Sequence, residues 1–191
     1  MVRDQGPRPT CLSFAISDVH KLRIPLDEHL SPESLHQAAA TRGNGATGGG
    51  VSIASALSAL MNDGQTTEGN WPYNSPQCTD VTLPFYCRAA TVGLFDPAAV
   101  TSWLAAGIPI VSILDIGEEF FLHSGENALN LSPGTAVEAC HAVAITGHRS
   151  VAGQNDFLVR NSWGAQWGMN GLAWISSDYL QSRSTAVIQV L

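Results

Sequence analysis

The sequence predicts an α+β fold with two lobes, because helical and strand patterns occupy different halves of the chain. Residues 1–90 carry apolar side chains at helical spacing, and residues 91–191 carry short β-branched runs separated by turn residues. At 191 residues the chain can bury a substantial core, either as one domain or as two lobes that share a cleft. We expect a mainly helical lobe over 1–90, a mainly β lobe over 91–191 and a cleft between them.

Three helices are expected in the first half. The first covers residues 12–22, after a loop in which Gly6, Pro7 and Pro9 forbid a helix. The second opens at Ser31-Pro32-Glu33, since serine is a good N-cap and proline fits the first helical position. The third ends at Gly64. Their expected apolar faces are Phe14, Ala15, Val19 and Leu22 in the first, Leu35, Ala38 and Ala39 in the second, and Ile53, Leu57, Leu60 and Met61 in the third.

Two connecting segments of the first half carry their own signals. Residues 43–50 contain five glycines and cannot hold regular structure, so a loop is expected there. Taken alone, that loop fits a flexible linker, and its glycines, which have no Cβ, also allow a close approach to the backbone. Residues 68–73 predict a turn that buries the aromatic side chains Trp71 and Tyr73.

The second half predicts strands, which we expect over 108–116, 142–147, 156–160, 172–175 and 186–190. A short helix precedes them, from Pro97 to Leu104, and Gly107 stops it. After the first strand, the apolar residues 120–122 are expected to pack beneath the turn-rich segment 125–134.

Composition and charge exclude several classes of protein. Forty-five per cent apolar and 13% charged residues exclude a disordered chain. The net charge of −7 comes from scattered carboxylates without a basic run, so neither nucleic acid nor an anionic membrane is expected as a partner. No apolar run reaches the roughly 20 residues of a membrane span. The first residues do not resemble a signal peptide, and since a leader could precede them, cytoplasmic and secreted locations both stay open.

Three polar residues stand where the fold would present them to a ligand. Cys11 lies where the loop turns into the first helix, and the positive end of that helix favours the thiolate. A cysteine that only packs in the core would fit the same pattern. His141 begins an apolar, β-branched run and Asn161 ends another. They follow Cys11 by 130 and 150 residues.

Together these residues resemble the papain-like cysteine peptidases, in which a histidine and an asparagine follow the nucleophile at this distance. The resemblance spans nearly the whole chain, and it implies a papain-like fold with a barrel-like β lobe. It also implies a single catalytic domain over 1–191 and the activity of a cysteine peptidase, a hydrolase. Its motifs are Gln5 ahead of Cys11, His141-Ala142-Val143, and Asn161-Ser162-Trp163-Gly164 followed by Trp167-Gly168-Met169-Asn170-Gly171.

The resemblance assigns a role to each of these side chains. Cys11 is the expected nucleophile that forms an acyl-enzyme, His141 the general base and acid, and Asn161 the residue that orients His141. Gln5 is expected in the oxyanion hole, although a glutamine in a loop is common at protein surfaces. Trp163 is expected to cover the bond between His141 and Asn161, or simply to pack in the core. The expected substrate-binding residues are Gly48, Gly49, Cys140, Ala142 and Trp163.

Cysteine usage says little about disulfides. Secreted papain relatives pair a cysteine three residues before the nucleophile with one in the glycine-rich loop. Arg8 and Ala46 stand at those positions here, which favours a bacterial or intracellular branch of the family. Cys78 and Cys87 are either bridged or free. No C-x-x-C pair and no close ligand spacing of the other histidines is present, so neither a metal nor a cofactor is expected.

Two other functions stay open beside an endopeptidase. An amidase, exopeptidase or acyl transferase acting on one peptide or cell-wall amide would use the same triad. A non-catalytic module that binds peptides or a partner protein would use the same fold, although such modules usually lose the cysteine or the histidine. A peptide or protein substrate is the expected partner, accompanied by a pro-segment or by further domains.

Overall fold

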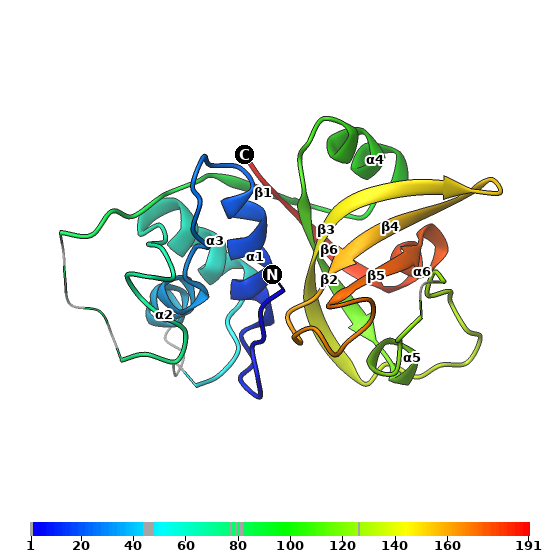
Figure 1. Ribbon diagram of the computed structural model, residues 1–191, viewed down its shortest axis with the longest axis horizontal. Coiled ribbons are helices and arrows are strands. Elements are labelled where there is room, and N and C mark those ends of the chain that lie inside the picture. The colour runs from blue at the N-terminus through cyan, green and yellow to red at the C-terminus, as the bar shows by residue number, and fades with distance from the viewer. Residues whose placement is uncertain (1, 44–47, 77, 79, 81, 126) are drawn as a thin grey trace. The chain divides into compact units, whose positions relative to one another are not determined.

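The computed structural model describes residues 2–43, 48–76, 78, 80, 82–125 and 127–191, which form two compact units. The β unit comprises Met1–Gly6 and Val92–Gln189, and the helical unit comprises Pro7–Thr91 and Val190–Leu191 (Figure 1). The first strand begins at Ala90, and residues 2–6 belong to the β unit although they precede the helices. The division into a helical lobe over 1–90 and a β lobe over 91–191 stays a prediction.

Backbone contacts join these first residues to the β unit. The N–H of Gln5 donates to the carbonyl of Ser162 over 2.8 Å, and the N–H of Gly164 donates to the carbonyl of Arg3 over 3.1 Å. Asp4 forms a β-bridge with Trp163. The loop that leads to Cys11 therefore starts in one unit and ends in the other.

The helical unit contains the three predicted helices, which are α1 (Cys11–Lys21), α2 (Pro32–Arg42) and α3 (Ile53–Asn62). Ser31 and Ser52 cap α2 and α3, and their hydroxyls accept from the N–H of Ser34 at 3.0 Å and of Ser55 at 3.1 Å. α3 packs against α2, and α1 contacts both. The buried apolar core of this unit includes Phe14, Ile16, Val19, Leu30, Leu35, Ala39 and Leu60.

The apolar faces are predicted only in part. In α2, Ala38 is partly exposed and Ala40 is buried instead. In α3, Met61 is 55% exposed, whereas the small residues Ala56 and Ala59 are buried. Because the distance between two packed helices depends on the side chains at their contact, small residues let α3 lie close to its neighbours. Alanines therefore fill part of the core that the hydrophobic stripe assigns to larger residues.

The loops of the helical unit follow the prediction where they are described. Gly43 and residues 48–50 lie outside helices and strands, and residues 44–47, Ala46 among them, fall outside the described part of the chain. In the turn that follows α3, Trp71 is buried and Tyr73 is partly buried.

One six-stranded sheet runs in the order β1-β6-β2-β3-β4-β5. The pairs β2–β3, β2–β6, β3–β4 and β4–β5 are antiparallel. All five predicted strands are confirmed, with shifted ends, and β1 was not predicted. The strands are β1 (Ala90–Gly93), β2 (Ile110–Ile116), β3 (Ala139–Val151), β4 (Gln154–Arg160), β5 (Leu172–Ser176) and β6 (Ser184–Val190).

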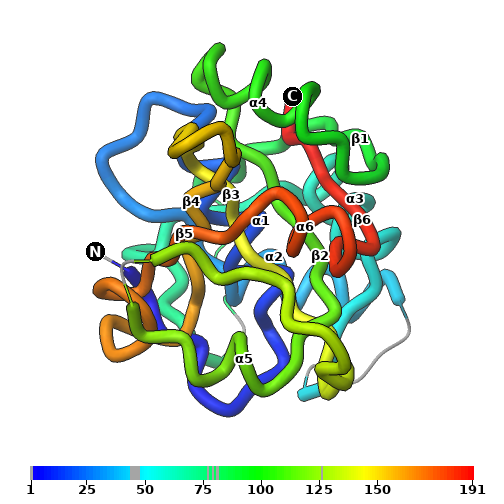
Figure 2. Tube along the Cα trace, turned by 90° about the vertical axis from the view of Figure 1, so that its right-hand side faces the viewer, coloured from blue at the N-terminus to red at the C-terminus, as the bar shows by residue number. Residues whose placement is uncertain are grey.

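Three helices accompany the sheet: α4 (Pro97–Ala105), α5 (Glu118–Phe121) and α6 (Ser177–Arg183). The predicted helix α4 begins at its N-cap Asp96, while α6 was not predicted and lies against β2, β4 and β5 (Figure 2). Phe120 is fully buried, but Phe121 is 40% exposed and Leu122 is 70% exposed. The prediction that all three pack beneath the next loop is therefore wrong for the last two, because a helix of one turn buries only one face.

The helices of the described residues are short. The longest have 11 residues, and none in this part of the chain is long and apolar enough to cross a membrane.

Two glycines after helices provide a test of the packing. Gly64 follows α3 and Gly107 follows α4, with nearly equal φ angles of +72° and +73°. A Cβ at Gly107 meets nothing within 4 Å, whereas a Cβ at Gly64 would lie 2.8 Å from the Tyr86 carbonyl. We expect Gly107→Ala to lower the free energy of unfolding by about 1–2 kcal/mol through backbone strain alone. Gly64→Ala should lower the free energy of unfolding by more than Gly107→Ala does, since the Tyr86 backbone must also move. Urea unfolding measures both, and equal losses would contradict this close approach.

Candidate active site

The pairing of β3 with β4 brings His141 and Asn161 together. His141 is the third residue of β3, and Asn161 directly follows the last residue of β4. In the antiparallel register Ala144 lies opposite Arg160, so the end of β4 lies beside the first part of β3. His141 Nε2 is 2.7 Å from Asn161 Oδ1. The two side chains thus form a hydrogen-bonded pair inside the β unit.

The backbone of Ser162 determines which atom of this pair carries the proton. The N–H of Ser162 donates to the same Asn161 Oδ1 over 2.8 Å. Because a backbone N–H can only donate, Oδ1 is the accepting oxygen and His141 Nε2 must be the donor. In a neutral imidazole a proton on Nε2 leaves the lone pair on Nδ1. Nδ1 is therefore the basic atom of His141.

Aromatic side chains enclose the pair. His141 is 4% exposed and Asn161 is 1% exposed. The indole of Trp163 packs against the imidazole with the ring centroids 4.5 Å apart, and Phe121 stacks on Trp163 at 5.3 Å. Phe120 contacts the rings of His141 and Trp163 at 6.0 Å and 5.6 Å. A hydrogen bond shielded from water in this way is stronger than an exposed one.

Burial also changes the acidity of His141. Loss of solvation has the largest effect and lowers the pKa of His141 to about 4, while the hydrogen bond to Asn161 opposes it. The imidazole is therefore neutral at pH 7 and can accept a proton at Nδ1. A charged imidazolium in this environment needs a negative charge beside the ring.

Gln5 is attached to the same group through Ser162. Besides the backbone bond described above, Ser162 Oγ donates to Gln5 Oε1 over 2.6 Å. Because Oε1 accepts this bond, the orientation of the Gln5 carboxamide is fixed and Nε2 is its donor end. Gln5, His141 and Asn161, which the sequence predicts as site residues, thus form one connected group in the β unit.

Cys11 is the first residue of α1, in the helical unit. Its N-cap Thr10 makes no side-chain capping bond, and the first turn of α1 carries no acidic residue. The positive end of the helix dipole is therefore not neutralised within α1, and it favours the thiolate. Cys11 is partly exposed, and it begins α1 at the point where the sequence predicts that the loop turns into the first helix.

The predicted substrate-binding residues differ in how much surface they offer. Gly48 is exposed and Gly49 partly exposed, both in the helical unit. Cys140 is exposed, and it directly precedes His141 in β3. Ala142 is 3% exposed because it lies in the interior of β3, opposite Ile113 of β2, so a substrate contact of its side chain is not supported.

Cys78 and Cys87 are not joined by a disulfide. Of the two alternatives that the sequence leaves open, the structure therefore has the unbridged one. Among the residues that the structure describes, no group of three His, Cys, Asp or Glu side chains is placed to hold a metal ion.

Two residues of the group were not assigned a role from the sequence. Ser162 belongs to the quoted motif, but the hydroxyl binds a residue 157 positions away, which no local pattern reveals. Phe121 was expected only to pack beneath a loop, whereas its ring stacks on Trp163. An aromatic pair at 120–121 after a buried strand was the only available signal.

Comparison with known proteins identifies the family. A family model described as papain family cysteine protease matches residues 1–188. The chain belongs to this family. The motifs at Cys11, His141 and Asn161 all lie within the matched residues.

Relatives in this family are distant in sequence. Fruit bromelain of Ananas comosus is 28% identical over 179 residues, which cover 89% of this chain and 49% of bromelain. Mouse pro-cathepsin H is 25% identical over 180 residues, which cover 89% of this chain and 54% of that protein. The chain thus spans about half the length of these curated relatives. Macrodontain-1 of Ananas macrodontes is 28% identical over 195 residues, which cover 95% of this chain and 85% of macrodontain-1.

Solved structures share the fold. Digestive procathepsin L 3 of Tenebrio molitor larval midgut has a TM-score of 0.77 at 22% identity, over 100% of this chain and 66% of that one. Xylellain, a cysteine protease from Xylella fastidiosa, has a TM-score of 0.76 at 19% identity, over 99% of this chain and 81% of that one. The predicted papain-like α+β fold is confirmed.

The burial of a neutral His141 predicts that acid destabilises the protein. Its folded pKa of about 4 lies below the unfolded value of 6.5, so the unfolded chain binds the proton first and stability is lost as the pH falls through this range. The difference corresponds to about 3 kcal/mol. We expect this loss in a Cys11→Ala background, which removes any effect of thiol ionisation.

The matched control for this measurement is Cys11→Ala/His141→Gln. It keeps His20 and His123, whose pKa values burial also lowers. Between pH 6.5 and pH 4 the free energy of unfolding of this control should fall by about 3 kcal/mol less than that of the Cys11→Ala variant, which retains His141. Parallel stability curves for the two variants, measured by urea unfolding at each pH, would contradict the burial of a neutral imidazole.

Proposed function

We propose that this chain is the catalytic domain of a cysteine peptidase, which hydrolyses peptide bonds through a Cys11 thiolate and a covalent acyl-enzyme. The observation that carries the proposal is the fixed tautomer of His141, in which Asn161 holds Nε2–H and Nδ1 is basic. Membership of the papain family supports it, as does the position of Cys11 at the start of α1.

In the proposed first step the Cys11 thiol gives its proton to Nδ1 of His141. A thiol with a pKa of about 8.5 is mostly protonated at neutral pH, so the helix end and the imidazole are both needed to form the thiolate. The negative sulfur in turn supplies the charge that a buried imidazolium requires. Asn161 keeps the ring oriented, because its Oδ1 accepts from Nε2 in both protonation states.

The thiolate then attacks the carbonyl carbon of the substrate. A C–S bond forms and the carbonyl electron pair moves to oxygen, where Gln5 Nε2 and the Cys11 N–H are the proposed donors. Collapse of this intermediate breaks the C–N bond, and the imidazolium protonates the departing amine. Water, deprotonated by His141, next attacks the thioester, and the acid product leaves with the thiol restored.

A peptide or protein is the proposed substrate. Gly48 and Gly49 have no side chain beyond the backbone, so an extended peptide could form backbone hydrogen bonds there. Cys140 and Trp163 are proposed as further contacts, since one precedes His141 in β3 and the other packs on its ring. Two similar structures are procathepsins by their titles, and we include a pro-segment in the proposal.

Replacing Cys11 by alanine tests the nucleophile. Turnover of peptides should fall by about 10⁴-fold or more, because no acyl-enzyme can form. The circular dichroism spectrum should stay unchanged, since Cys11 is only partly buried. Cys87→Ala is the matched control, as Cys87 is an exposed cysteine of the same unit, and it should keep full activity.

A peptide epoxide followed by mass spectrometry gives a second view of the same proposal. It should modify Cys11 and spare the other three cysteines, and equal modification of all four would contradict the assignment.

Digestion of a peptide library separates the related functions. Internal cuts identify an endopeptidase, terminal cuts or transfer products identify an exopeptidase or transferase, and binding without cleavage identifies a non-catalytic module.

Gln5→Ala tests the proposed oxyanion donor. The value of kcat should fall by about 10²–10³-fold with KM little changed, because the oxyanion exists only after attack. Ser162→Ala keeps the donor and removes the bond that fixes Gln5 Oε1, so its loss should be smaller. Steady-state kinetics measure both variants, and a Gln5→Ala enzyme with unchanged kcat would exclude this role.

A further inference from the structure

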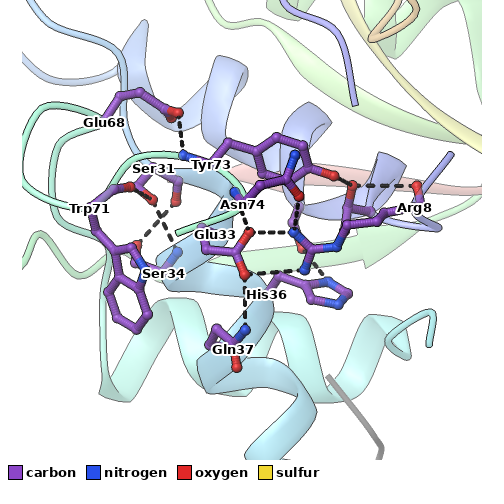
Figure 3. A network of polar contacts seen from close by, with 12 residues as sticks. Arg8, Ser31, Glu33, Ser34, His36, Gln37, Glu68, Trp71, Tyr73 and Asn74 are labelled. Atoms are coloured by element: carbon purple, nitrogen blue, oxygen red, sulfur yellow. Dashed lines mark hydrogen bonds and ion pairs between the residues drawn. The ribbon is translucent and has the colours of Figure 1, made fainter. Parts of the chain in front are cut away.

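Arg8 forms an ion pair with Glu33 beside the loop that leads to Cys11. Arg8 Nη1 lies 2.5 Å from Glu33 Oε2, and Nη2 lies 3.1 Å from Oε1, so guanidinium and carboxylate meet at two points. Glu33, in the first turn of α2, is 1% exposed. Figure 3 shows its carboxylate between Arg8, Asn74 and Gln37. A buried charge of this kind is tolerated only when it is paired and hydrogen-bonded.

Each oxygen of Glu33 accepts two hydrogen bonds. Oε2 accepts from Arg8 and from the backbone N–H of Asn74 at 3.1 Å, and Oε1 accepts from Arg8 and from Gln37 Nε2 at 2.8 Å. Burial opposes ionisation, but these hydrogen bonds outweigh it and lower the pKa of Glu33. The carboxylate therefore stays charged at neutral pH and holds its donors in fixed directions.

The contacts of Arg8 continue to the residue immediately before Cys11. The guanidinium carbon lies 4.9 Å from the centroid of the Tyr73 ring, and the Tyr73 hydroxyl lies 2.8 Å from Thr10 Oγ1. Thr10 is the N-cap of α1, and its N–H donates to the Arg8 carbonyl over 2.8 Å. Phe14, in α1, packs edge-on against Tyr73 at 4.8 Å. The start of α1 is thus held on both sides of Cys11.

Asn74 shows that the neighbouring turn is shaped by the same contacts. Its φ of +62° lies in the left-handed region, which asparagine tolerates better than most residues. In this conformation its N–H donates to Glu33, and its Oδ1 accepts from Arg8 Nη1 at 2.8 Å. Three separate segments therefore converge on one guanidinium–carboxylate pair.

We propose that Arg8 is a positioning residue: anchored by Glu33, it fixes the loop before Cys11 and so sets the direction of the Cys11 thiol and N–H. The inference rests on the proposed function of Cys11. Arg8 and Glu33 do not touch the reacting atoms, and they act through Thr10 and Tyr73 on the start of α1. Since a displacement of about 1 Å at a reacting group can cost about 10²-fold in rate, an anchor of this kind has a measurable effect.

A double-mutant cycle with Arg8→Ala and Glu33→Gln tests this role on the full chain. The control is Arg42→Ala, because Arg42 also meets a carboxylate, that of Asp63, at two points in the same unit. That pair is about one-third exposed and joins the end of α2 to the segment after α3. Three quantities are measured: kcat and KM for a fluorogenic peptide, and the rate at which iodoacetamide modifies Cys11, which is followed by mass spectrometry.

We expect each single variant to lower both kcat and the alkylation rate of Cys11 by about ten- to a hundredfold, with KM little changed. The double variant should lose no more than either single variant, because the two residues act as one unit. Arg8→Lys keeps the charge but only one of the two contacts, so it should recover part of the rate. It also serves as the test variant where Arg8→Ala does not fold. Arg42→Ala should stay within about twofold of the unmodified protein.

Other outcomes overturn the inference. If Arg8→Ala matches Arg42→Ala in kcat and in alkylation rate, Arg8 has no positioning role, even if the variant is less stable. Additive losses in the double variant would exclude the pairing with Glu33. Failure of the proposed function has a different signature, because the unmodified protein then cleaves no peptide while the alkylation rates still separate Arg8 from Arg42.

Discussion

The oxygen of Asn161 accepts one hydrogen bond from the backbone of its neighbour and one from His141. With both donors in place, neither the amide nor the imidazole can be reversed, and the basic nitrogen of His141 is the one that does not face Asn161. The pairing of β3 with β4 sets the distance between the two side chains, and the surrounding aromatic rings keep water out. Ser162 extends the constraint to Gln5. The orientation of the His141, Asn161 and Gln5 side chains thus depends on one strand pairing and on the hydrogen bonds of one residue, Ser162.

Features encoded within a few residues are the ones that the sequence predicts well. The serine and proline at the start of α2 and the change from a proline-rich loop to helix at Cys11 are local signals, and the structure has both. The β-branched runs around His141 and before Asn161 are equally local, so both residues could be placed in or directly after strands. The papain-like motifs predict how these elements combine into one fold, which the spacing of apolar residues alone does not predict.

Contacts between distant segments are the ones that the sequence could not predict. The start of the chain joins the β unit because the backbone of residues 3–5 pairs with the segment after Asn161, and no local pattern in those residues reveals it. The buried alanines of α3 carry little hydrophobic signal, although they pack better than Met61. The sequence singles out Arg8 only because secreted relatives have a cysteine at that position. The partner of Arg8, Glu33 in α2, is 25 positions away.

Arg8 stands where, by resemblance, secreted relatives carry one cysteine of a disulfide, and here it is held by an ion pair with Glu33 of α2. A disulfide opens under reductants, which are the same agents that keep a sulfur nucleophile from oxidation. A guanidinium and a carboxylate exchange no electrons. A reducing medium therefore protects the sulfur of Cys11 from oxidation and leaves the ion pair between Arg8 and Glu33 intact. The link instead yields to protons, and only under conditions acidic enough to neutralise a carboxylate whose pKa is already lowered.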